Sequence, residues 1–521
     1  MCTGMELGRF AIEPKLSTPS SRFGNVGQMS VPLNYSEPHG EKAAIAITRY
    51  PAAVPADSPL YHGPILFNPG SPGGSGVALI ASAGSVLAQI IGPEFDIVGF
   101  DPRGVSHSTL HVSLFETDIE RALWDDVVVR DMNTSADTVG RQWACAQVNG
   151  HLASERAGNY LPHINTENTA RDMMRIVEAH GREKLQYWGF SYGSVLGAVF
   201  ASIFPDNVGH LIIDGVVDTE DYFDTDYSLA LWANNMVDAD KAMQTFFDGC
   251  SAAGPDGCAF YAPTPDSIRT QPIPVRTPSN YGLVDLALLR RVILDVLYAP
   301  QGYFAPLAEV LAALTRSDGA PLFELPFLDP TFECSCEPTD HQADVLLDQE
   351  ALMAIICNDG RAVPSGFEEA ERHYKNMLLA SDWGFGGLFA SIRISCSGWP
   401  DIPKKHFQGP VGGNTSVPML IIGNTAVLTS AKKTVKAFPG SVVLTQDCAG
   451  HSSLAAPSPC TWGYVRDYFL NGTLPETDTV CPVVGSPFPD ARLKALEETV
   501  DQSVLEAFTA MQRSRAAKLL L

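Results

Sequence analysis

The segment KLQYWGFSYGSVLGAVFASIF, residues 184–204, decides the fold of this chain. Its first part, Leu185–Phe190, is a short apolar run that predicts a buried strand, and Gly193–Phe204 predicts a helix directly after it. Between them stands Gly189-Phe190-Ser191-Tyr192-Gly193, with the pattern G-x-S-x-G. In a strand–turn–helix setting this pattern is typical of a nucleophile elbow, a strained turn that holds a serine hydroxyl above a sheet. A Gly/Ser turn without chemistry is the alternative.

Strands and helices alternate through the first 218 residues. Apolar runs predict strands at Ala43–Tyr50, Pro64–Phe67, Phe95–Phe100 and His210–Asp214. Helical spacing predicts helices at Val77–Ile91 and at Thr166–His180, where Thr166 is a possible N-cap. This alternation predicts an α/β fold with a mostly parallel sheet flanked by helices.

The pattern changes at about residue 219. Up to residue 400, helical segments such as Tyr222–Phe247 and Leu283–Val296 alternate with Pro-rich loops. The α/β pattern then returns, with predicted strands and helices at Val417–Ile422, Ala431–Phe438, Ser441–Leu444 and Cys460–Phe469, and an amphipathic helix from Arg492 onward. We therefore predict a core whose first half is 1–218, a helical lid at 219–400, and a second core half at 401–521.

Composition narrows the possible partners. The chain has 521 residues, with 35 Lys and Arg against 59 Asp and Glu, a formal net charge of −24. This balance argues against binding to nucleic acid or to an anionic membrane, both of which need clustered basic residues. No apolar stretch reaches the length of a membrane span. Cys334 and Cys336 lack the second pair that a zinc site needs. We predict no metal and no cofactor, and the oligomeric state stays open.

Signals for the cellular compartment disagree. The chain has 11 cysteines; Cys250 and Cys258 flank a short closed loop, and Cys460 and Cys481 bracket the last compact segment, which favours an oxidising compartment. Glycosylation sequons also occur, at Asn34, Asn133, Asn414 and Asn471. The first 20 residues, however, contain no apolar core of a signal peptide. Secretion of a mature form and a cytoplasmic location therefore both stay open.

Two more segments have the features of catalytic parts. Asn68–Gly76, NPGSPGGSG, follows a predicted strand and could turn its N–H groups toward one point. With the N–H of Tyr192, which follows the serine, we predict that the N–H of Ser71 forms an oxyanion hole. The general base should be a histidine on a loop after a late strand. His451 fits, because the strand Ser441–Leu444 precedes it and Gly450 frees the backbone.

These motifs resemble the α/β-hydrolases of the tripeptidyl-aminopeptidase and prolyl-aminopeptidase-like group, most of all its secreted fungal and actinobacterial branch. The matching pieces span nearly the whole chain in order: NPGSPGGSG, FDIVGFDPRG, YWGFSYGS, LIIDGVVD, VPMLIIGNTA and AGHSS. The resemblance implies an α/β-hydrolase fold with a lid. It also implies a serine hydrolase that acts through Ser191 and His451 on an acyl bond (peptide, amide or ester) of a short peptide or small molecule.

In such an exopeptidase, acidic lid residues could hold the amino group of the substrate. A solvated surface is the simpler interpretation of the four candidates, which are Glu333, Glu337, Asp340 and Asp344.

One departure concerns the catalytic acid. The resemblance implies the pattern G-x-T-x-D-P-x-T-P, in which the Asp orients the histidine. Residues 423–430 of this chain read GNTAVLTS and contain no acid. Losing this carboxylate in a serine protease costs about 10⁴ in turnover. Asp214, at the end of a strand, or Asp447, before His451, could substitute. Alternatively, Asn424 or Thr425 could hold the ring through a neutral hydrogen bond and leave a weak Ser–His dyad.

The missing acid also opens two functions other than hydrolysis. The pocket and oxyanion hole could serve a cofactor-free lyase, isomerase or cyclase in secondary metabolism, in which no acyl-enzyme forms. The chain could also be a binding protein built on a degraded hydrolase, although an intact elbow, Gly-rich loop and His451 argue against this. These alternatives differ in how strictly they need the Ser191 hydroxyl.

Overall fold

The structure is a computed structural model of the whole chain. It describes residues 26–125, 127–128, 131–223, 233–261, 272–278, 281–325, 348–426, 428–488 and 502–513. Cys334, Cys336 and the four lid acids Glu333, Glu337, Asp340 and Asp344 lie outside the described residues, as does the start of the predicted tail helix at Arg492.

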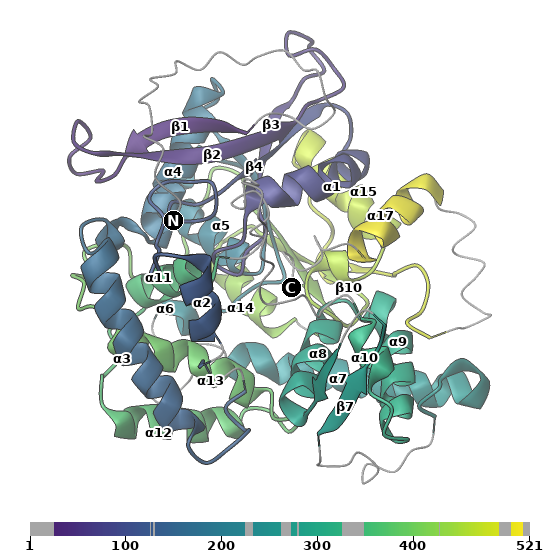
Figure 1. Cartoon of the computed structure of the whole chain (residues 1–521). Coiled ribbons are helices and arrows are strands. Elements are labelled where there is room, and N and C mark those ends of the chain that lie inside the picture. The colour runs from purple at the N-terminus through teal and green to yellow at the C-terminus, as the bar shows by residue number, and fades with distance from the viewer. Residues whose placement is uncertain are drawn as a thin grey trace.

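A nine-stranded sheet forms the centre of the molecule (Figure 1). Its order is β1-β2-β4-β3-β5-β6-β9-β10-β11, and β2 pairs antiparallel with β1 and β4, while the pairs from β4 to β11 are parallel. The mostly parallel sheet predicted from the sequence is therefore confirmed. The strands are β1 Gly27–Pro32, β2 Lys42–Tyr50, β3 Gly63–Asn68, β4 Phe95–Phe100, β5 Leu185–Phe190, β6 Val208–Asp214, β9 Leu420–Asn424, β10 Val442–Gln446 and β11 Val480–Cys481.

Both faces of the sheet are buried, which explains why its central strands are continuous apolar runs. Successive residues of one strand enter different hydrophobic clusters: Leu66 and Tyr187 pack in the first, whereas Phe67 and Trp188 pack in the other. The first face is covered by α4 (Thr166–Ala179), α5 (Tyr192–Ile203), α11 (Gln349–Asp359) and α14 (Thr429–Ala437). The second is covered by α1 (Gly76–Ile91), α15 (Pro459–Asn471) and α17 (Gln502–Arg513), which lie together in Figure 1.

The insertion between β6 and β9 is mainly helical, as expected. It contains α6 (Thr219–Phe223), α7 (Ala233–Gly257), α8 (Leu286–Tyr298), α9 (Pro300–Leu314), α10 (Ala320–Phe323), α11, α12 (Phe367–Leu378) and α13 (Gly386–Ser395). It also contains the hairpin of β7 (Ile273–Arg276) and β8 (Tyr281–Val284). Two groups of these helices lie below the sheet in Figure 1, α12 and α13 on one side and α7 to α10 on the other.

Segments outside the insertion pack against it. Helix α3 (Thr138–Ala157) precedes the insertion in sequence but packs on α12 and α13 (Figure 1). The short helix α2 (Asp118–Asp125) also precedes the insertion. One hydrophobic cluster joins Val139 of α3 to Phe246, Leu307 and Ile394 of the insertion. The division at residue 219 therefore stays a prediction about sequence order, because the packing crosses it.

Two local predictions were wrong. Leu283 and Val284 belong to β8 rather than to a helix, because Asp285 begins α8 by accepting a hydrogen bond from the main-chain N–H of Leu288 at 2.8 Å. The N-cap of α4 is Asn165 rather than Thr166, and its side chain accepts from Asn168 N at 2.9 Å. The Thr166 side chain therefore does not cap this helix.

In the part of the chain that the structure describes, disulfides join Cys250 to Cys258, Cys357 to Cys396 and Cys460 to Cys481. Within the described residues, no helix has both the length and the apolar character needed to cross a bilayer.

Candidate active site

Ser191 lies in the turn between β5 and α5. Its φ of 54° and ψ of −122° are unusual for a residue with a side chain, and such strain is typical of the nucleophile elbow. The turn is tied to the neighbouring strand, since Ser191 N donates to the carbonyl of Asp214 at 3.0 Å.

The glycines on both sides of Ser191 are sterically required. A Cβ on Gly189 would lie 2.4 Å from the carbonyl oxygen of Gly193, and one on Gly193 would lie 2.8 Å from that of Asn68. Both approaches are closer than any side chain tolerates. The two glycines therefore allow β5, α5 and the end of β3 to converge.

The Gly-rich loop after β3 passes directly over the elbow. A Cβ on Gly70 would lie 2.8 Å from Ser191 Cβ and 2.9 Å from the main-chain N of Tyr192. Gly70 N is held by Asn68 Oδ1 at 3.0 Å, and Ser71 follows with a φ of 88°. The two predicted oxyanion donors, Tyr192 and Ser71, thus lie on two segments that touch at Gly70.

His451 lies on the loop after β10, at the same edge of the sheet. Its main-chain N donates to the carbonyl of Tyr298 at 3.1 Å, and the two rings meet edge to face, with centroids 5.0 Å apart. A Cβ on Gly215 would lie 3.2 Å from His451 Cε1, and Gly215 follows the residue that binds Ser191 N. The ring nitrogen Nε2 is buried without a partner, and burial lowers the pKa of His451 to about 4.

Asp214 contacts the loop that carries His451 and not the ring. Its carboxylate accepts from the main-chain N of Ser453 at 2.8 Å, from Ser453 Oγ at 2.5 Å, and from Trp188 Nε1 at 3.2 Å. Burial raises the pKa of Asp214 to about 6, although these hydrogen bonds oppose the increase. The side chain is therefore placed to hold the backbone after His451.

Asn424, at the end of β9, holds the same loop. Its Nδ2 donates to the carbonyls of Gly450 at 2.9 Å and Ser452 at 2.7 Å, the two residues that flank His451. Its Oδ1 is buried without a partner. Asp447 is exposed and accepts from Thr425 Oγ1 at 2.9 Å. Among the described residues, no hydrogen bond joins the His451 ring to a carboxylate or to Ser191.

Three side chains that hold this loop were missed by sequence analysis. Gln446, at the end of β10, donates to the carbonyls of Ser453 and Ala456 at 3.0 and 3.2 Å. Gln512 of α17 donates to those of Leu454 and Ala455 at 2.8 and 2.9 Å. Tyr298 comes from the lid. The position of Gln446 at a strand end was a usable signal, whereas the other two contacts depend on tertiary packing alone.

Unsatisfied polar atoms gather at the carboxyl ends of the parallel strands. Asn68 Nδ2, Asn424 Oδ1, Gln446 Oε1 and His451 Nε2 are all buried without a protein partner. Buried polar atoms without a hydrogen-bond partner are rare in folded proteins, and they often occur where a protein binds a ligand or catalyses a reaction. In open α/β sheets, ligands bind at this edge.

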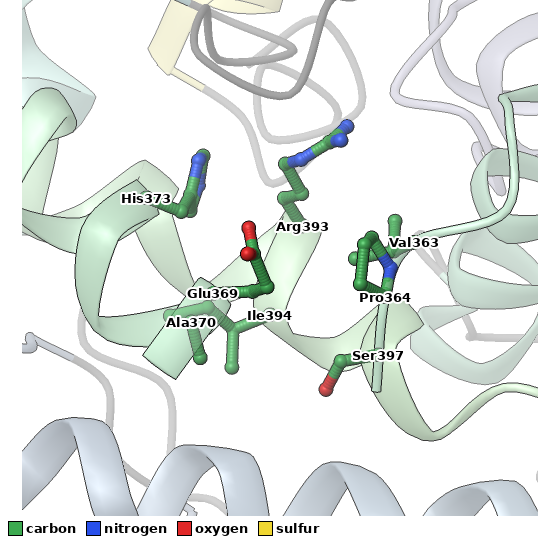
Figure 2. Close-up of a pocket in the computed structure, with 8 residues that line it drawn as sticks. All are labelled: Val363, Pro364, Glu369, Ala370, His373, Arg393, Ile394 and Ser397. Carbon is green, nitrogen blue, oxygen red and sulfur yellow. The ribbon is translucent and has the colours of Figure 1, made fainter. Parts of the chain in front are cut away.

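A pocket also lies in the insertion between β6 and β9. Figure 2 shows its lining, with His373 of α12 and Arg393 of α13 near the Glu369 carboxylate and Ser397 across from them. Burial and the charge of Arg393 lower the pKa of His373 to about 4. None of the predicted site residues lines this pocket. Within the described part of the chain, no cluster of three or more His, Cys, Asp or Glu side chains is arranged to hold a metal.

Comparisons with known proteins agree with the fold. A family model described as "alpha/beta hydrolase fold" matches residues 63–254, and one described as "TAP-like protein" matches residues 381–481. A tripeptidyl aminopeptidase of Streptomyces coelicolor is 27% identical over 89% of this chain and 84% of its own. The serine protease Hip1 of Mycobacterium tuberculosis is 26% identical over 90% and 89%, and a carboxylesterase B of the same species is 27% identical over 89% and 87%.

Proposed function

Because this chain is a TAP-like α/β-hydrolase, we propose that it is a serine hydrolase of short peptides that uses Ser191 as nucleophile and His451 as base. The observation that carries this proposal is the elbow: Ser191 stands in a strained turn at the N-terminus of α5, under the Gly-rich loop. Its relatives are named for peptide and ester hydrolysis, and both attack an acyl carbon.

The proposed reaction has two steps. The Ser191 hydroxyl attacks the carbonyl carbon of the substrate, His451 takes the proton, and the N–H groups of Tyr192 and Ser71 bind the developing oxyanion. Collapse expels the amine or alcohol, which receives the proton from His451. A water molecule then hydrolyses the acyl-enzyme by the same sequence of proton transfers.

No carboxylate among the residues that the structure describes binds the His451 ring, so the proposed base works without a charged partner from that part of the chain. At neutral pH, the lowered pKa keeps the imidazole unprotonated and ready to accept a proton. The same burial disfavours the imidazolium that forms in the transition state. We infer that Asn424 and Asp214 contribute by fixing the main chain around His451. Ser191 and His451 then form a catalytic dyad whose histidine is held in position through its backbone.

A fluorophosphonate probe tests the proposal directly, because it reacts only with an activated serine. The wild type is expected to be labelled and to hydrolyse tripeptidyl p-nitroanilides, while Ser191→Ala should do neither. Ser202→Ala is the matched control, since Ser202 lies further along α5 and its hydroxyl donates to the carbonyl of Ala198 at 2.8 Å. A wild type that the probe does not label, although it is folded, would contradict the proposal.

A second function is favoured by one observation, the hydrogen bonding of Asp214 and Asp447 to groups other than His451. A cofactor-free lyase, isomerase or cyclase would need the oxyanion donors but no acyl-enzyme. In that case Ser191→Ala would keep a substantial share of turnover on the natural substrate, while His451→Ala would lose it. Complete loss in both variants supports hydrolysis.

A further inference from the structure

The side chain of Tyr192, next to the nucleophile, belongs to a buried hydrogen-bond chain that the mechanism does not use. Tyr192 Oη lies 2.5 Å from Thr166 Oγ1, and Thr166 Oγ1 donates to Asp359 Oδ2 at 2.5 Å. Asp359 also accepts from Thr166 N at 2.8 Å and from Tyr222 Oη at 2.8 Å. Asp359 is completely buried, and burial raises its pKa.

The proton positions in this chain follow from donor counting. A threonine hydroxyl has one proton, and Thr166 gives that proton to Asp359. Tyr192 must therefore be the donor to Thr166. The Tyr192 ring is tied through its O–H to a buried carboxylate, and its main-chain N–H is the predicted oxyanion donor one residue after Ser191.

Asp359 is the last residue of α11, and the other end of this helix touches the second half of the predicted oxyanion hole. Asp348, the N-cap of α11, donates its N–H to the carbonyl of Gly73 at 3.0 Å. A Cβ on Gly73 would lie 2.5 Å from the Asp348 carbonyl oxygen. One lid helix therefore contacts the Gly-rich loop at its start and, through Thr166, the Tyr192 side chain at its end.

We propose that Asp359, acting through Thr166, is a positioning residue that sets the direction of the Tyr192 N–H toward the oxyanion. This inference rests on the proposed function, because it needs a tetrahedral intermediate at Ser191. An oxyanion donor contributes only when its N–H points at the developing charge, and a deleted donor costs about 10² to 10³ in turnover. Displacing the N–H donor should lower turnover less than deleting it does.

Thr166→Val is the central variant, since valine keeps the shape of threonine and removes the hydroxyl. We expect kcat to fall about 10- to 100-fold, with KM within about twofold of the wild-type value. Thr166→Ser keeps the hydroxyl and should restore most of kcat. Thr169→Val is the matched control: Thr169 is a buried threonine on the same helix that bonds to Asn165 O at 3.1 Å.

A second variant reports on the link to the elbow. Tyr192→Phe removes the O–H at the start of the chain, and the double variant with Thr166→Val should lose no more than the worse single variant, because both break the same link. Affinity for a peptide boronate, which forms a tetrahedral adduct on the serine, should fall in parallel with kcat. Melting temperatures separate these effects from misfolding.

The outcomes separate the two proposals. If the wild type is labelled by a fluorophosphonate but Thr166→Val keeps full kcat and boronate affinity, the role of Asp359 is overturned and the hydrolase proposal stands. A loss in Thr169→Val equal to that in Thr166→Val would also overturn it, by showing a general packing effect. A wild type that the probe does not label would overturn both.

Discussion

The Asp214 carboxylate accepts two hydrogen bonds from Ser453, one from the main-chain N of Ser453 at 2.8 Å and one from Ser453 Oγ at 2.5 Å. Ser453 comes two residues after His451, so this carboxylate acts on the backbone of the base loop. Its own main-chain carbonyl binds Ser191 N at 3.0 Å. One residue at the end of β6 therefore links the nucleophile turn to the base loop.

This relationship predicts a modest catalytic effect for Asp214. Asp214→Asn and Ser453→Ala should each lower kcat about 10- to 100-fold, because both loosen the base loop without changing the ring. A carboxylate that orients the imidazole itself would be worth about 10⁴. Steady-state kinetics on a p-nitroanilide distinguish the two, with exposed Asp447→Asn as the control. A 10⁴-fold loss confined to Asp214→Asn would contradict the structure.

The raised pKa of Asp214 predicts a pH-dependent stability. The pKa of Asp214 is about 6 in the folded state and about 4 in the unfolded state. Between about pH 4 and 6 the folded state therefore binds more protons than the unfolded state. Asp214 should therefore make the free energy of unfolding decrease as pH rises from about 4 to 6, by about 3 kcal/mol. Urea unfolding of wild type and Asp214→Asn over this range measures the difference in slope. Parallel curves would be evidence against the shift.

Introducing an acid at residue 424, beside the backbone that flanks His451, should not create a catalytic carboxylate. Asn424→Asp would replace the Nδ2 donor by a carboxylate facing the carbonyls of Gly450 and Ser452, at 2.9 and 2.7 Å in the native structure. We expect stability to fall by about 3 kcal/mol, the cost of an unpaired buried charge, and activity to fall with it. Asn424→Ala should do less harm at neutral pH. Higher activity in Asn424→Asp would mean that the residue faces the ring.

The lowered pKa of His451, whose Nε2 atom is buried, predicts that activity persists to unusually low pH. The base must be unprotonated, and its pKa is about 4, so kcat/KM should rise with pH through about 4 and stay level above pH 6. Tyr298→Ala removes the ring that covers His451 and should move this rise toward about 6.5. Tyr298→Phe keeps the ring and should resemble wild type. If kcat/KM of the wild type rises with pH near about 6.5 instead, the imidazole is hydrated and the prediction is wrong.

The disulfide between Cys357 and Cys396 should stabilise the active site as well as the fold. It closes a loop of 39 residues, for which chain entropy gives about 4 kcal/mol. It also anchors α11 two residues before Asp359. Cys357→Ser/Cys396→Ser should therefore lower the melting temperature and kcat together. The Cys250→Ser/Cys258→Ser pair, which opens the disulfide at the C-terminal end of α7, should lower stability without this effect on kcat.

Much of the candidate site was predictable because each part has a local sequence signal. The elbow lies between Leu185–Phe190 and its helix, the Gly-rich loop follows β3, and His451 follows β10. Parallel strands bring their carboxyl ends to one edge, so strand order alone places these segments together. A steric role was predictable for Gly189 and Gly193, which flank the serine in a strained turn, whereas the close approach of Gly70 to Ser191 appears only in the structure.

Partners remote in sequence could not be predicted. Hydrogen-bonding capacity shows that Asp214 and Asn424 need partners, but not whether these are the ring of His451 or the backbone around it. That choice depends on side-chain directions and on distances of a few tenths of an ångström, which packing of the whole sheet and lid sets. The sequence by itself determined the fold and the segments that carry Ser191 and His451, because each has a local signal. Only the tertiary structure decided which groups hold His451 and Tyr192 in place, because those contacts join segments that are remote in sequence.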